Sequence, residues 1–570
     1  MEKYSNLPKD NPEEAMNLST EQKRNKKLAE KLFPGELPSI QSLFEKYPKR
    51  ELPEDAMVTR IAPSPTGFMH IGGIYMALIS KHFADQTKGV YYLRIEDTDK
   101  KREVEGARKV IVESLHRFGL DPEEGEGTDG IERGKYGPYR QSERKDIYKS
   151  FIKYLVEIDR AYPCFCSEEE LEKTHKMQEE LKVRPGYYGT WAKCRDIDKN
   201  FAGEMLEQNK PFVIRLRSTG NNANTFIHND LIKGSVELPE NDLDAVIMKS
   251  DELPTYHLAH AVDDHLMGTT HVLRGDEWLS SIPLHYELFQ ALNFKHPEYA
   301  HIAPINKIDE SGGKRKLSKR KDPEANVAFY EEHGYPEIAV TEYLLNIANP
   351  DFEAWRKNNP DKSPLGFKLF FNKLSTGAGP IFDKIKLQNI AKEVIGKMKS
   401  EELYQSVLSW ALKHDSEFGK IISSDPEYWL RVFSIERGGN KPRKDISMWS
   451  EVKEVFSFFN KEQFTKPDWS NFTSVLSSSE IKDIISQCSE IISSVDSPEE
   501  WMEKIRQIAA NFGFAPNTKT FKENRNKYRG HIGEIAQVIR FSITGLTKSP
   551  DLYQTMQALG EQECKKRLAL

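Results

Sequence analysis

The pattern of apolar residues between positions 57 and 99 predicts two strands and a helix. Val58 to Ala62 is predicted to be a short strand, and it is followed by a loop rich in proline and glycine. Apolar side chains then recur at helical spacing, at positions 71, 74, 75, 78, 79 and 83. Gly89 ends that helix, and Val90 to Ile95 is a second apolar run. A strand, a helix and a strand in this order predict a βαβ unit with parallel strands.

Polar side chains stand where these two strands end. Arg60 closes the first strand, and Glu96 follows the second. Ligands of parallel sheets bind beyond the carboxyl ends of the strands. Gly72 and Gly73 leave space for a ligand near the open start of the helix, where free backbone amides favour phosphate and His70 lies close by. The pattern predicts a nucleotide site; a loop that only turns the chain is the weaker alternative, because charges and glycines fall together.

Helical spacing appears in three other places. Residues 1–55 are rich in Lys, Glu, Asn and Pro and contain one weak helical stretch, Glu21 to Leu32; we expect a solvated or loosely docked extension. Lys101 to Phe118 carries an apolar stripe typical of a helix. From about residue 322 helical spacing dominates, and residues 396–570 contain amphipathic helices and basic turns without a catalytic constellation.

Composition narrows the class of protein. Of the 570 residues, 30% are charged and 38% apolar, and no apolar run is long enough to cross a bilayer. The first twenty residues are polar and charged rather than a signal peptide, and the five cysteines form no regular framework. We therefore expect a cytoplasmic protein of several domains that binds no membrane. The net charge of −6 excludes a basic nucleic-acid coat, so any RNA contact must use local basic patches.

Three cysteines in one segment suggest a metal site. Cys164, Cys166 and Cys194 have C-x-C…C spacing, and Asp196 or Tyr188 could supply a fourth ligand. A structural Zn²⁺ and reduced free cysteines both remain open, because the segment lacks a complete set of four cysteine and histidine ligands.

Two motifs resemble the signature of class I aminoacyl-tRNA synthetases. His70-Ile71-Gly72-Gly73 is similar to the HIGH motif, with glycine in place of the last histidine and its phosphate contact. Lys316-Leu317-Ser318-Lys319-Arg320 resembles the second motif, KMSKS. Ala62-Pro63-Ser64-Pro65-Thr66-Gly67 resembles glutamyl-tRNA synthetases of bacterial type, whereas glutaminyl enzymes carry a Pro-Pro-Glu-Pro-Asn-Gly form. Both motifs in this order are far more specific than either alone.

The resemblance covers about residues 56–570 and implies an α/β fold. A Rossmann-type parallel-sheet catalytic domain would carry an inserted α+β acceptor-binding module and precede an all-helical C-terminal half. In the family the insertion grips the acceptor end of tRNA, and candidate phosphate contacts are Arg144, Arg215, Arg217 and Lys249; for each of them taken singly, an ordinary surface charge is the alternative. The implied domains are an N-terminal extension (1–55), the first catalytic half (56–140), the insertion (141–249), the second catalytic half (250–311), the KMSKS loop and stem-contact domain (312–395) and a helical anticodon-binding domain (396–570).

The same resemblance implies the substrates and the site residues. L-glutamate would be activated by ATP with Mg²⁺ and passed to tRNA-Glu, and we expect a monomer. The implied amino-acid-binding residues are Arg60, Ala62, Ser64, Glu96, Tyr256, His260 and Arg274, with His260 in place of the asparagine of some members. The implied ATP-binding residues are His70, Gly72, Gly73, Arg102, Glu277, Trp278, Lys316 and Lys319. The implied catalytic residues are His70, Lys316 and Lys319.

The charges of glutamate fit this set of residues. Two carboxylates and one ammonium require two cations and one anion that are held apart. In the family pattern Arg274 takes the side-chain carboxylate and Glu96 the ammonium, while Arg60 and Ser64 orient the substrate. Arginine forks match carboxylates, and glutamine would leave a buried cation partly unpaired at a cost of about 1–3 kcal/mol. Activation needs no general base because the attacking α-carboxylate is already an anion, so catalysis is positioning and stabilisation of phosphate charge.

Three alternatives are weaker. The Ser-Pro-Thr form of the loop and the helical C-terminal half argue against a glutaminyl-tRNA synthetase. Small-molecule nucleotidyltransferases share an H-x-G-H element but are short. An RNA-binding synthetase paralogue without charging activity would not need Arg60, Glu96, Arg274 and Lys319 together. Whether tRNA-Gln is also charged stays open at the level of sequence.

Overall fold

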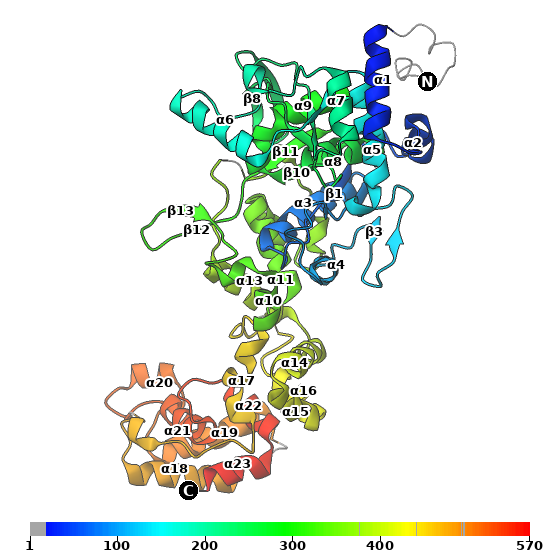
Figure 1. The fold of residues 1–570 in the computed structure, drawn as a ribbon. Coiled ribbons are helices and arrows are strands. Elements are labelled where there is room, and N and C mark those ends of the chain that lie inside the picture. Colours follow the sequence, from blue (N-terminus) through cyan, green and yellow to red (C-terminus); the bar gives the residue numbers. More distant parts are fainter. Residues whose placement is uncertain are drawn as a thin grey trace. The chain divides into compact units, whose positions relative to one another are not determined.

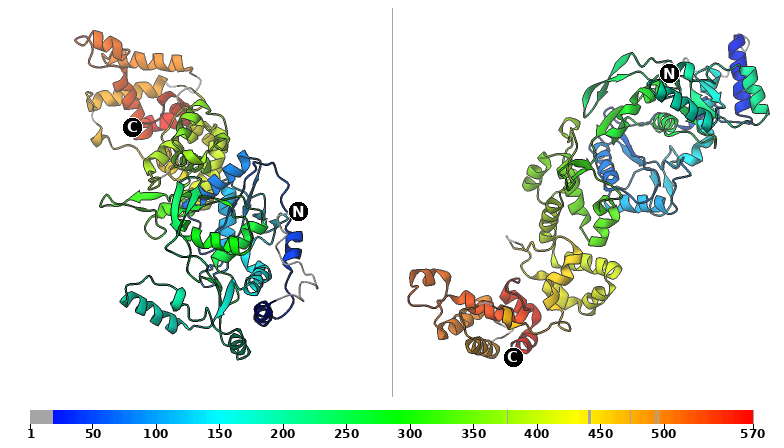
Figure 2. Two further views of the ribbon diagram at one scale, coloured as in Figure 1. Left: turned by 90° about the horizontal axis from the view of Figure 1, so that it is seen from above. Right: turned by 60° about the vertical axis from the view of Figure 1, so that its left-hand side comes forward.

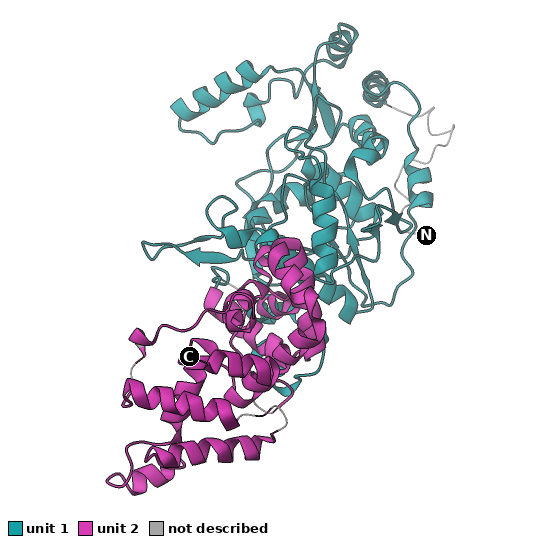
Figure 3. Cartoon of the chain, turned by 90° about the horizontal axis from the view of Figure 1, so that it is seen from below, with its two compact units in different colours: residues 1–329, 344–382 teal, residues 330–343, 383–570 magenta. Residues whose placement is uncertain are grey.

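The computed structural model describes residues 19–375, 377–439, 442–472, 474–491, 493 and 496–569. The chain divides into two compact units, drawn in different colours in Figure 3. The first consists of residues up to 329 together with 344–382, and the second of 330–343 together with 383 onwards. None of the helices in the described ranges combines the length and apolar character needed to span a bilayer.

The first unit contains the predicted βαβ motif (Figure 1). β1 (Val58–Ile61) and β2 (Val90–Leu93) pair in parallel, with Val58 opposite Val90. α3 (Ile71–Gln86) connects them and buries an apolar face. Only glycine fits at position 89, because a Cβ there would lie 1.9 Å from the Met57 carbonyl oxygen. The predicted parallel unit is confirmed.

A second parallel pair follows later in the chain. β10 (His271–Gly275) pairs in parallel with β11 (Glu298–Ile302). α8 (Tyr256–Leu266) precedes β10, and α9 (Ile282–Ala291) lies between the two strands in sequence. Beside the start of β1, the Thr270 N–H donates to the Val58 carbonyl oxygen at 3.0 Å. β1 and β10 therefore lie side by side, which joins the two parallel pairs.

Between the two parallel pairs the chain forms helices and antiparallel strands, as the predicted α+β insertion requires. β5, β6 and β9 form an antiparallel sheet, and β7 pairs with β8 as a hairpin. The Leu231 N–H, just after β7, donates to the Tyr299 carbonyl oxygen of β11 at 2.9 Å. The elements are α5 (Lys145–Glu157), β5 (Ala161–Cys164), α6 (Glu168–Glu180), α7 (Lys199–Glu207), β6 (Val213–Leu216), β7 (Thr225–Asp230), β8 (Gly234–Pro239) and β9 (Val246–Met248).

The N-terminal helices pack on the first unit. α1 (Thr20–Leu32) begins at a capping box made by Ser19 and lies against α5 and α7, in blue in Figures 1 and 2. Its buried side chains, Leu28 and Leu32 among them, join the same apolar core as α5. α2 (Ile40–Lys46) buries Leu43 in this core. The expected solvated or loosely docked extension is therefore wrong for residues 19–55; residues 1–18 lie outside the described part.

The helix expected from Lys101 begins later. α4 (Ala107–Arg117) starts after Gly106, whose φ of 78° is left-handed and cannot continue a helix backwards. The remaining elements of this unit are β3 (Gly125–Glu126), β4 (Glu132–Arg133), β12 (Asn306–Ile308), β13 (Lys314–Lys316) and α12 (Asp351–Asn358). β12 and β13 pair antiparallel, so the KMSKS-like residues begin at the end of a hairpin. α10 (Val327–His333) and α11 (Glu337–Ala348) each contain residues of both units.

The second unit is helical, which confirms the predicted class of the C-terminal half. One apolar core joins its helices, with Trp429, Trp449 and Trp501 among the buried side chains. The helices are α13 (Lys384–Lys397), α14 (Ser400–His414), α15 (Ser416–Ser424), α16 (Pro426–Ser434), α17 (Val452–Val455), α18 (Ser478–Ile491), α19 (Pro498–Asn511), α20 (Thr518–Glu523), α21 (Ile532–Thr544), α22 (Leu552–Leu559) and α23 (Glu561–Leu568).

Candidate functional site

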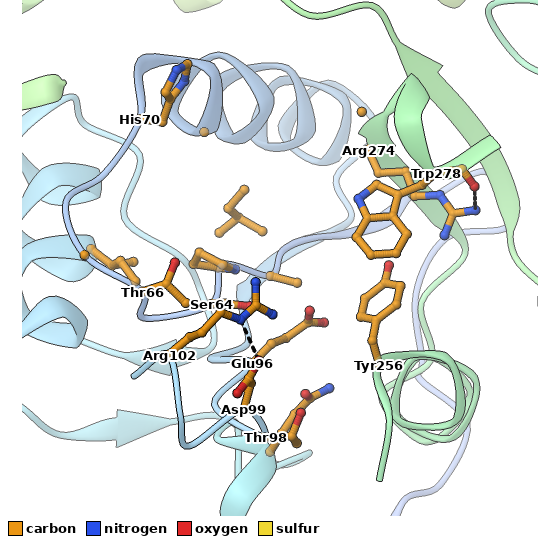
Figure 4. Close-up of a pocket in the computed structure, with 18 of the residues that line it drawn as sticks. Ser64, Thr66, His70, Glu96, Thr98, Asp99, Arg102, Tyr256, Arg274 and Trp278 are labelled. Carbon is orange, nitrogen blue, oxygen red and sulfur yellow. Dashed lines mark hydrogen bonds and ion pairs between the residues drawn. The ribbon is translucent and has the colours of Figure 1, made fainter. Parts of the chain in front are cut away.

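A cavity of about 910 Å³ lies at the polar strand ends of the first unit (Figure 4). Its size falls in the range of small-ligand pockets. Its walls come from the end of β1, the loop before α3, the turn after β2, the start of α8 and the end of β10. The predicted site residues on its wall are Arg60, Ala62, Ser64, His70, Gly73, Glu96, Arg102, Tyr256, Arg274, Trp278 and Lys319.

The structure brings the three predicted charges, Arg60, Glu96 and Arg274, to this one cavity. All three side chains are largely buried. Burial raises the pKa of Glu96, and Arg94 and Arg60 offset part of that effect. Two cations and one anion therefore face one volume, which is the arrangement that a glutamate pocket requires.

Arg94 is a structural residue of the site that the sequence did not single out. It is fully buried, and its guanidinium bridges Glu96 at 3.1 Å and Asp264 at 2.6 Å. Asp264 also faces the Arg60 Nε at 3.4 Å. Burial opposes ionisation of Asp264, but Arg60 and Arg94 hold its pKa well below the usual range. The only signal in the sequence was an arginine inside an apolar strand.

His260 lies behind the cavity wall. It is fully buried on α8, its ring lies 5.8 Å from that of Tyr256, and its Nε2 lies 2.9 Å from the Tyr299 hydroxyl. Burial lowers the pKa of His260 to about 4. The residue is therefore placed to support Tyr256 rather than to line the cavity.

A second cavity of about 450 Å³ adjoins the start of α3. His70 and Lys319 line both cavities, and the remaining predicted ATP residues, Gly72, Glu277 and Lys316, line this one. The start of a helix attracts phosphate through its free amides. Every residue predicted to bind ATP thus borders one of two neighbouring cavities.

His70 caps α3 as a neutral side chain. Its Nδ1 accepts the Gly72 N–H at 2.9 Å, and its Nε2 lies 3.3 Å from the Leu317 carbonyl oxygen. The first contact leaves the ring proton on Nε2, which donates to Leu317. Burial lowers the pKa of His70, and Lys319 and Lys316 lower it further. The HIGH-like and KMSKS-like segments are therefore in direct contact.

Two lysines and an arginine have partners that a nucleotide could displace. Lys316 lies 3.0 Å from Glu277. Burial lowers the pKa of Lys319, whose Nζ donates to the Phe68 carbonyl oxygen at 3.0 Å. Arg102 is exposed at the mouth of the first cavity and pairs with Asp99 at 2.6 Å.

The three cysteine thiols lie together in the insertion. The sulfurs of Cys164, Cys166 and Cys194 are within 4.8 Å of one another. The Tyr187 hydroxyl oxygen is 3.4 Å from both Cys164 and Cys166 Sγ and accepts the Cys194 N–H at 2.9 Å. This tyrosine completes a cluster of three thiols and one hydroxyl.

The two candidates for a fourth ligand have other partners. The Tyr188 hydroxyl donates to the Arg184 carbonyl oxygen at 2.7 Å, and the exposed Asp196 pairs with Arg217 at 3.0 Å. Between the two neighbouring tyrosines, Tyr187 rather than Tyr188 turns its hydroxyl towards the thiols.

Two of the four expected phosphate contacts are internal. Arg144 is fully buried, with its Nε 2.7 Å from Asp263, so it cannot reach RNA. Arg215 is buried under the ring of Tyr187, 3.9 Å from its centroid. The expectation is wrong for these two because each side chain holds the unit together. Arg217 pairs with Asp196, as above, and Lys249 lines the first cavity.

Comparisons with known proteins agree with this geometry. Residues 56–353 match the family model of class I tRNA synthetases (E and Q), catalytic domain, and residues 434–570 match an anticodon binding domain. The chain is 45% identical to the glutamate–tRNA ligase of Sorangium cellulosum over 549 residues, covering 92% of this chain and 96% of that protein. It is 44% identical to the glutamate–tRNA ligase of Clostridium perfringens (strain 13), covering 95% and 99%.

A solved structure resembles most of the chain. The crystal structure of a glutamate tRNA ligase from Elizabethkingia meningosepticum in complex with its amino acid matches with a TM-score of 0.71 at 27% identity. The match covers 90% of this chain and 98% of that one.

Proposed function

The chain belongs to the class I tRNA synthetases of the E and Q type, and we propose from this membership that it ligates L-glutamate to the 3′ end of tRNA-Glu. The reaction consumes ATP, passes through glutamyl-adenylate and releases AMP and pyrophosphate. The observation that carries the proposal is the meeting of Arg60, Glu96 and Arg274 in one cavity that adjoins the start of α3.

Glutamate is held by its three charges. Arg274 binds the side-chain carboxylate and Glu96 binds the ammonium, while Arg60 and Ser64 orient the α-carboxylate. Glu96 is the only one of the three charges that must lose a proton to act, and its side chain is largely buried. Tyr256 and Trp278, whose rings are 4.3 Å apart, close one side of the pocket.

ATP occupies the adjoining cavity. The backbone amides at Gly72 and Gly73 and the ammonium groups of Lys316 and Lys319 stabilise the phosphates, and His70 orders the loop between them. Glu277 borders the rest of the ATP molecule in this cavity, and Arg102 and Trp278 border it from the wall of the first cavity. Mg²⁺ neutralises charge on the phosphates when it is bound. The α-carboxylate of glutamate attacks the α-phosphate, the bond to pyrophosphate breaks, and a terminal ribose hydroxyl of tRNA then takes the glutamyl group.

The thiol cluster suits a structural Zn²⁺. Cys164, Cys166 and Cys194 would supply the sulfur ligands that zinc prefers, and Tyr187, whose hydroxyl lies 3.4 Å from Cys166 Sγ, would be the fourth ligand. The ion would stabilise the insertion that holds the acceptor end of tRNA.

The parts of the chain outside the catalytic domain bind tRNA. The catalytic domain consists of residues 56–140 and 250–311. Residues 141–249 hold the acceptor end of tRNA, residues 312–395 contact its stem, and residues 396–570 bind the anticodon. The enzyme acts in the cytoplasm as a monomer.

Aminoacylation of separately purified tRNA-Glu and tRNA-Gln tests the proposal. We expect glutamate to be attached to tRNA-Glu in an ATP-dependent reaction and glutamine to be refused. Charging with glutamine, or RNA binding without charging, contradicts it. The extent of glutamate transfer to tRNA-Gln in the same experiment defines the tRNA specificity.

A further inference from the structure

Arg274 is held by neutral partners. Its Nε donates to His301 Nε2 at 3.0 Å, one terminal nitrogen lies 3.1 Å from His285 Nδ1, and the other donates to the Trp278 carbonyl oxygen at 3.2 Å. Within the described part of the chain no ion pair joins Arg274 to a carboxylate. Three of the five guanidinium hydrogens are used, which leaves one on each terminal nitrogen. That is the number that a bidentate carboxylate requires.

His301 can accept from Arg274 only in one tautomer. Its Nδ1 lies 2.6 Å from the Asp230 carboxylate, so the ring proton sits on Nδ1 and the lone pair on Nε2. Burial lowers the pKa of His301, and Asp230 offsets only part of that effect. A proton on Nε2 would face the Arg274 Nε–H and break the contact.

Asp230 is itself fixed as an anion. It ends β7, and its Oδ1 accepts the backbone N–H groups of Ile232 and Lys233, both at 2.9 Å. Burial opposes its ionisation, but the nearby His228 ring and hydrogen bonds from His301 and these amides hold the pKa of Asp230 well below its usual range. The carboxylate can therefore accept from His301 at neutral pH.

A metal site is the other interpretation of these residues, since ligand atoms of His228, Asp230 and His301 lie within 4.8 Å of one another. Hydrogen bonds already use the Asp230 carboxylate and His228 Nδ1, which lies 2.8 Å from the Tyr286 hydroxyl, whereas His228 Nε2 lies 3.6 Å from Asp230 and has no hydrogen-bond partner among the described residues. Both nitrogens of His301 are occupied, and the cationic Arg274 adjoins the cluster. A relay of hydrogen bonds fits these contacts better than a cation does.

We propose that Asp230 and His301 are positioning residues for Arg274. Asp230 sets the tautomer of His301, and His301 fixes the guanidinium so that its two free N–H groups face the side-chain carboxylate of the amino acid. The inference rests on the proposed role of Arg274. Asp230 lies on the β7–β8 hairpin of the insertion. The packing of that hairpin against β11 therefore affects the selection of the amino acid.

Three variants test the relay. Asp230→Asn keeps an oxygen for the turn amides but turns a donor towards His301, which forces the proton to Nε2. His301→Phe removes the relay, and His301→Gln retains one donor and one acceptor. Ser235→Ala is the control, because Ser235 lies on the same hairpin and its hydroxyl donates only to the exposed Asn229 side chain at 2.9 Å. Charging is measured at saturating tRNA-Glu and ATP with glutamate and with glutamine.

We expect Asp230→Asn and His301→Phe to raise KM for glutamate about tenfold or more with a smaller change in kcat, and to lower the preference for glutamate over glutamine. His301→Gln should recover most of the loss, and Ser235→Ala should match the wild type. Unchanged glutamate KM in Asp230→Asn, or no recovery in His301→Gln, overturns the proposal.

Two further measurements distinguish a failure of the relay from a failure of the proposed role of Arg274. Arg274→Ala should lose glutamate use; if it does not, the proposed role of Arg274 itself fails, and the relay fails with it. If Arg274→Ala loses glutamate use while Asp230→Asn does not, only the relay fails. ¹⁵N NMR of the histidine side chains should place the wild-type proton of His301 on Nδ1 and the Asp230→Asn proton on Nε2. A wild-type proton on Nε2 overturns the proposal without reference to activity.

Discussion

Lys319 Nζ donates a hydrogen bond to the carbonyl oxygen of Phe68 at 3.0 Å, joining positions 251 residues apart in the chain. Phe68 belongs to the loop that leads into α3, and the ammonium also lies 4.8 Å from the centroid of its ring. The contact holds a cation at the start of α3, where the phosphates of ATP are proposed to bind. The loop that carries the KMSKS-like motif is thus in contact with the loop that leads into the HIGH-like motif.

Lys319→Ala should reduce glutamyl-adenylate formation about a hundredfold or more while tRNA binding largely survives. The variant removes a cation that stabilises charge on the phosphates, and loss of one such donor typically costs about 2.7–4 kcal/mol of barrier. Pyrophosphate exchange in the presence of tRNA measures the effect. Lys321→Ala is the matched control, since this exposed lysine loses the same charge two residues further on and lines neither cavity. Near-normal exchange in Lys319→Ala contradicts the role of the loop.

Much of the site was predictable because its signals are local. The alternation of strand and helix periods predicts β1, α3 and β2, and the rule for parallel sheets then places Arg60 and Glu96 at one edge. Arg274 reaches the same cavity from a strand more than two hundred residues later. Its place followed from resemblance to the family and not from periodicity.

The contacts behind the cavity were not predictable because they depend on tertiary pairing. Arg94 and Asp264 are 170 positions apart, and Arg144 and Asp263 are 119 apart. A sequence displays such an arginine without its partner, so Arg144 was expected at the surface as a candidate contact to tRNA phosphate. The choice of Tyr187 over Tyr188 at the thiols depends on which way a short loop turns, and apolar spacing carries no information on that.

The affinity for glutamate should fall in mild acid. Glu96 must be ionised to bind the ammonium group, and its pKa is raised by burial, so protonation begins at a higher pH than for an ordinary carboxyl group. KM for glutamate should therefore rise as the pH falls from neutral, with a midpoint above the usual value for glutamate side chains, about 4.3. Glu96→Gln should have a high KM that no longer depends on this ionisation. The exposed Glu103→Gln should retain the wild-type profile.

Asp264→Asn should destabilise the first unit by about 3–5 kcal/mol, because it leaves the buried Arg94 and Arg60 without their shared counter-ion. Calorimetry measures this loss of stability. The relevant unfolding transition is the one whose midpoint temperature rises when ATP and glutamate bind. The pKa of Asp264 is lowered in the folded state, so its contribution is present above the unfolded pKa and is lost only as the pH falls into acid. The difference from the wild type should hence stay constant near neutral pH. Asp146→Asn, at an exposed position on α5, should unfold as the wild type does.

Purified protein should contain one zinc ion per chain, held by the thiol cluster and Tyr187. Cys166→Ser should lose the metal, since a hydroxyl is a poor substitute for a thiolate, and elemental analysis measures the content. Tyr187→Phe should weaken zinc binding in competition with a chelator, whereas Tyr188→Phe should not, because the Tyr188 hydroxyl contacts only the Arg184 carbonyl oxygen among the described residues. Equal zinc retention by the two tyrosine variants excludes Tyr187 as a ligand. Zinc-free protein from a zinc-supplemented culture instead favours reduced free thiols, whose packing around Tyr187 would then be purely structural.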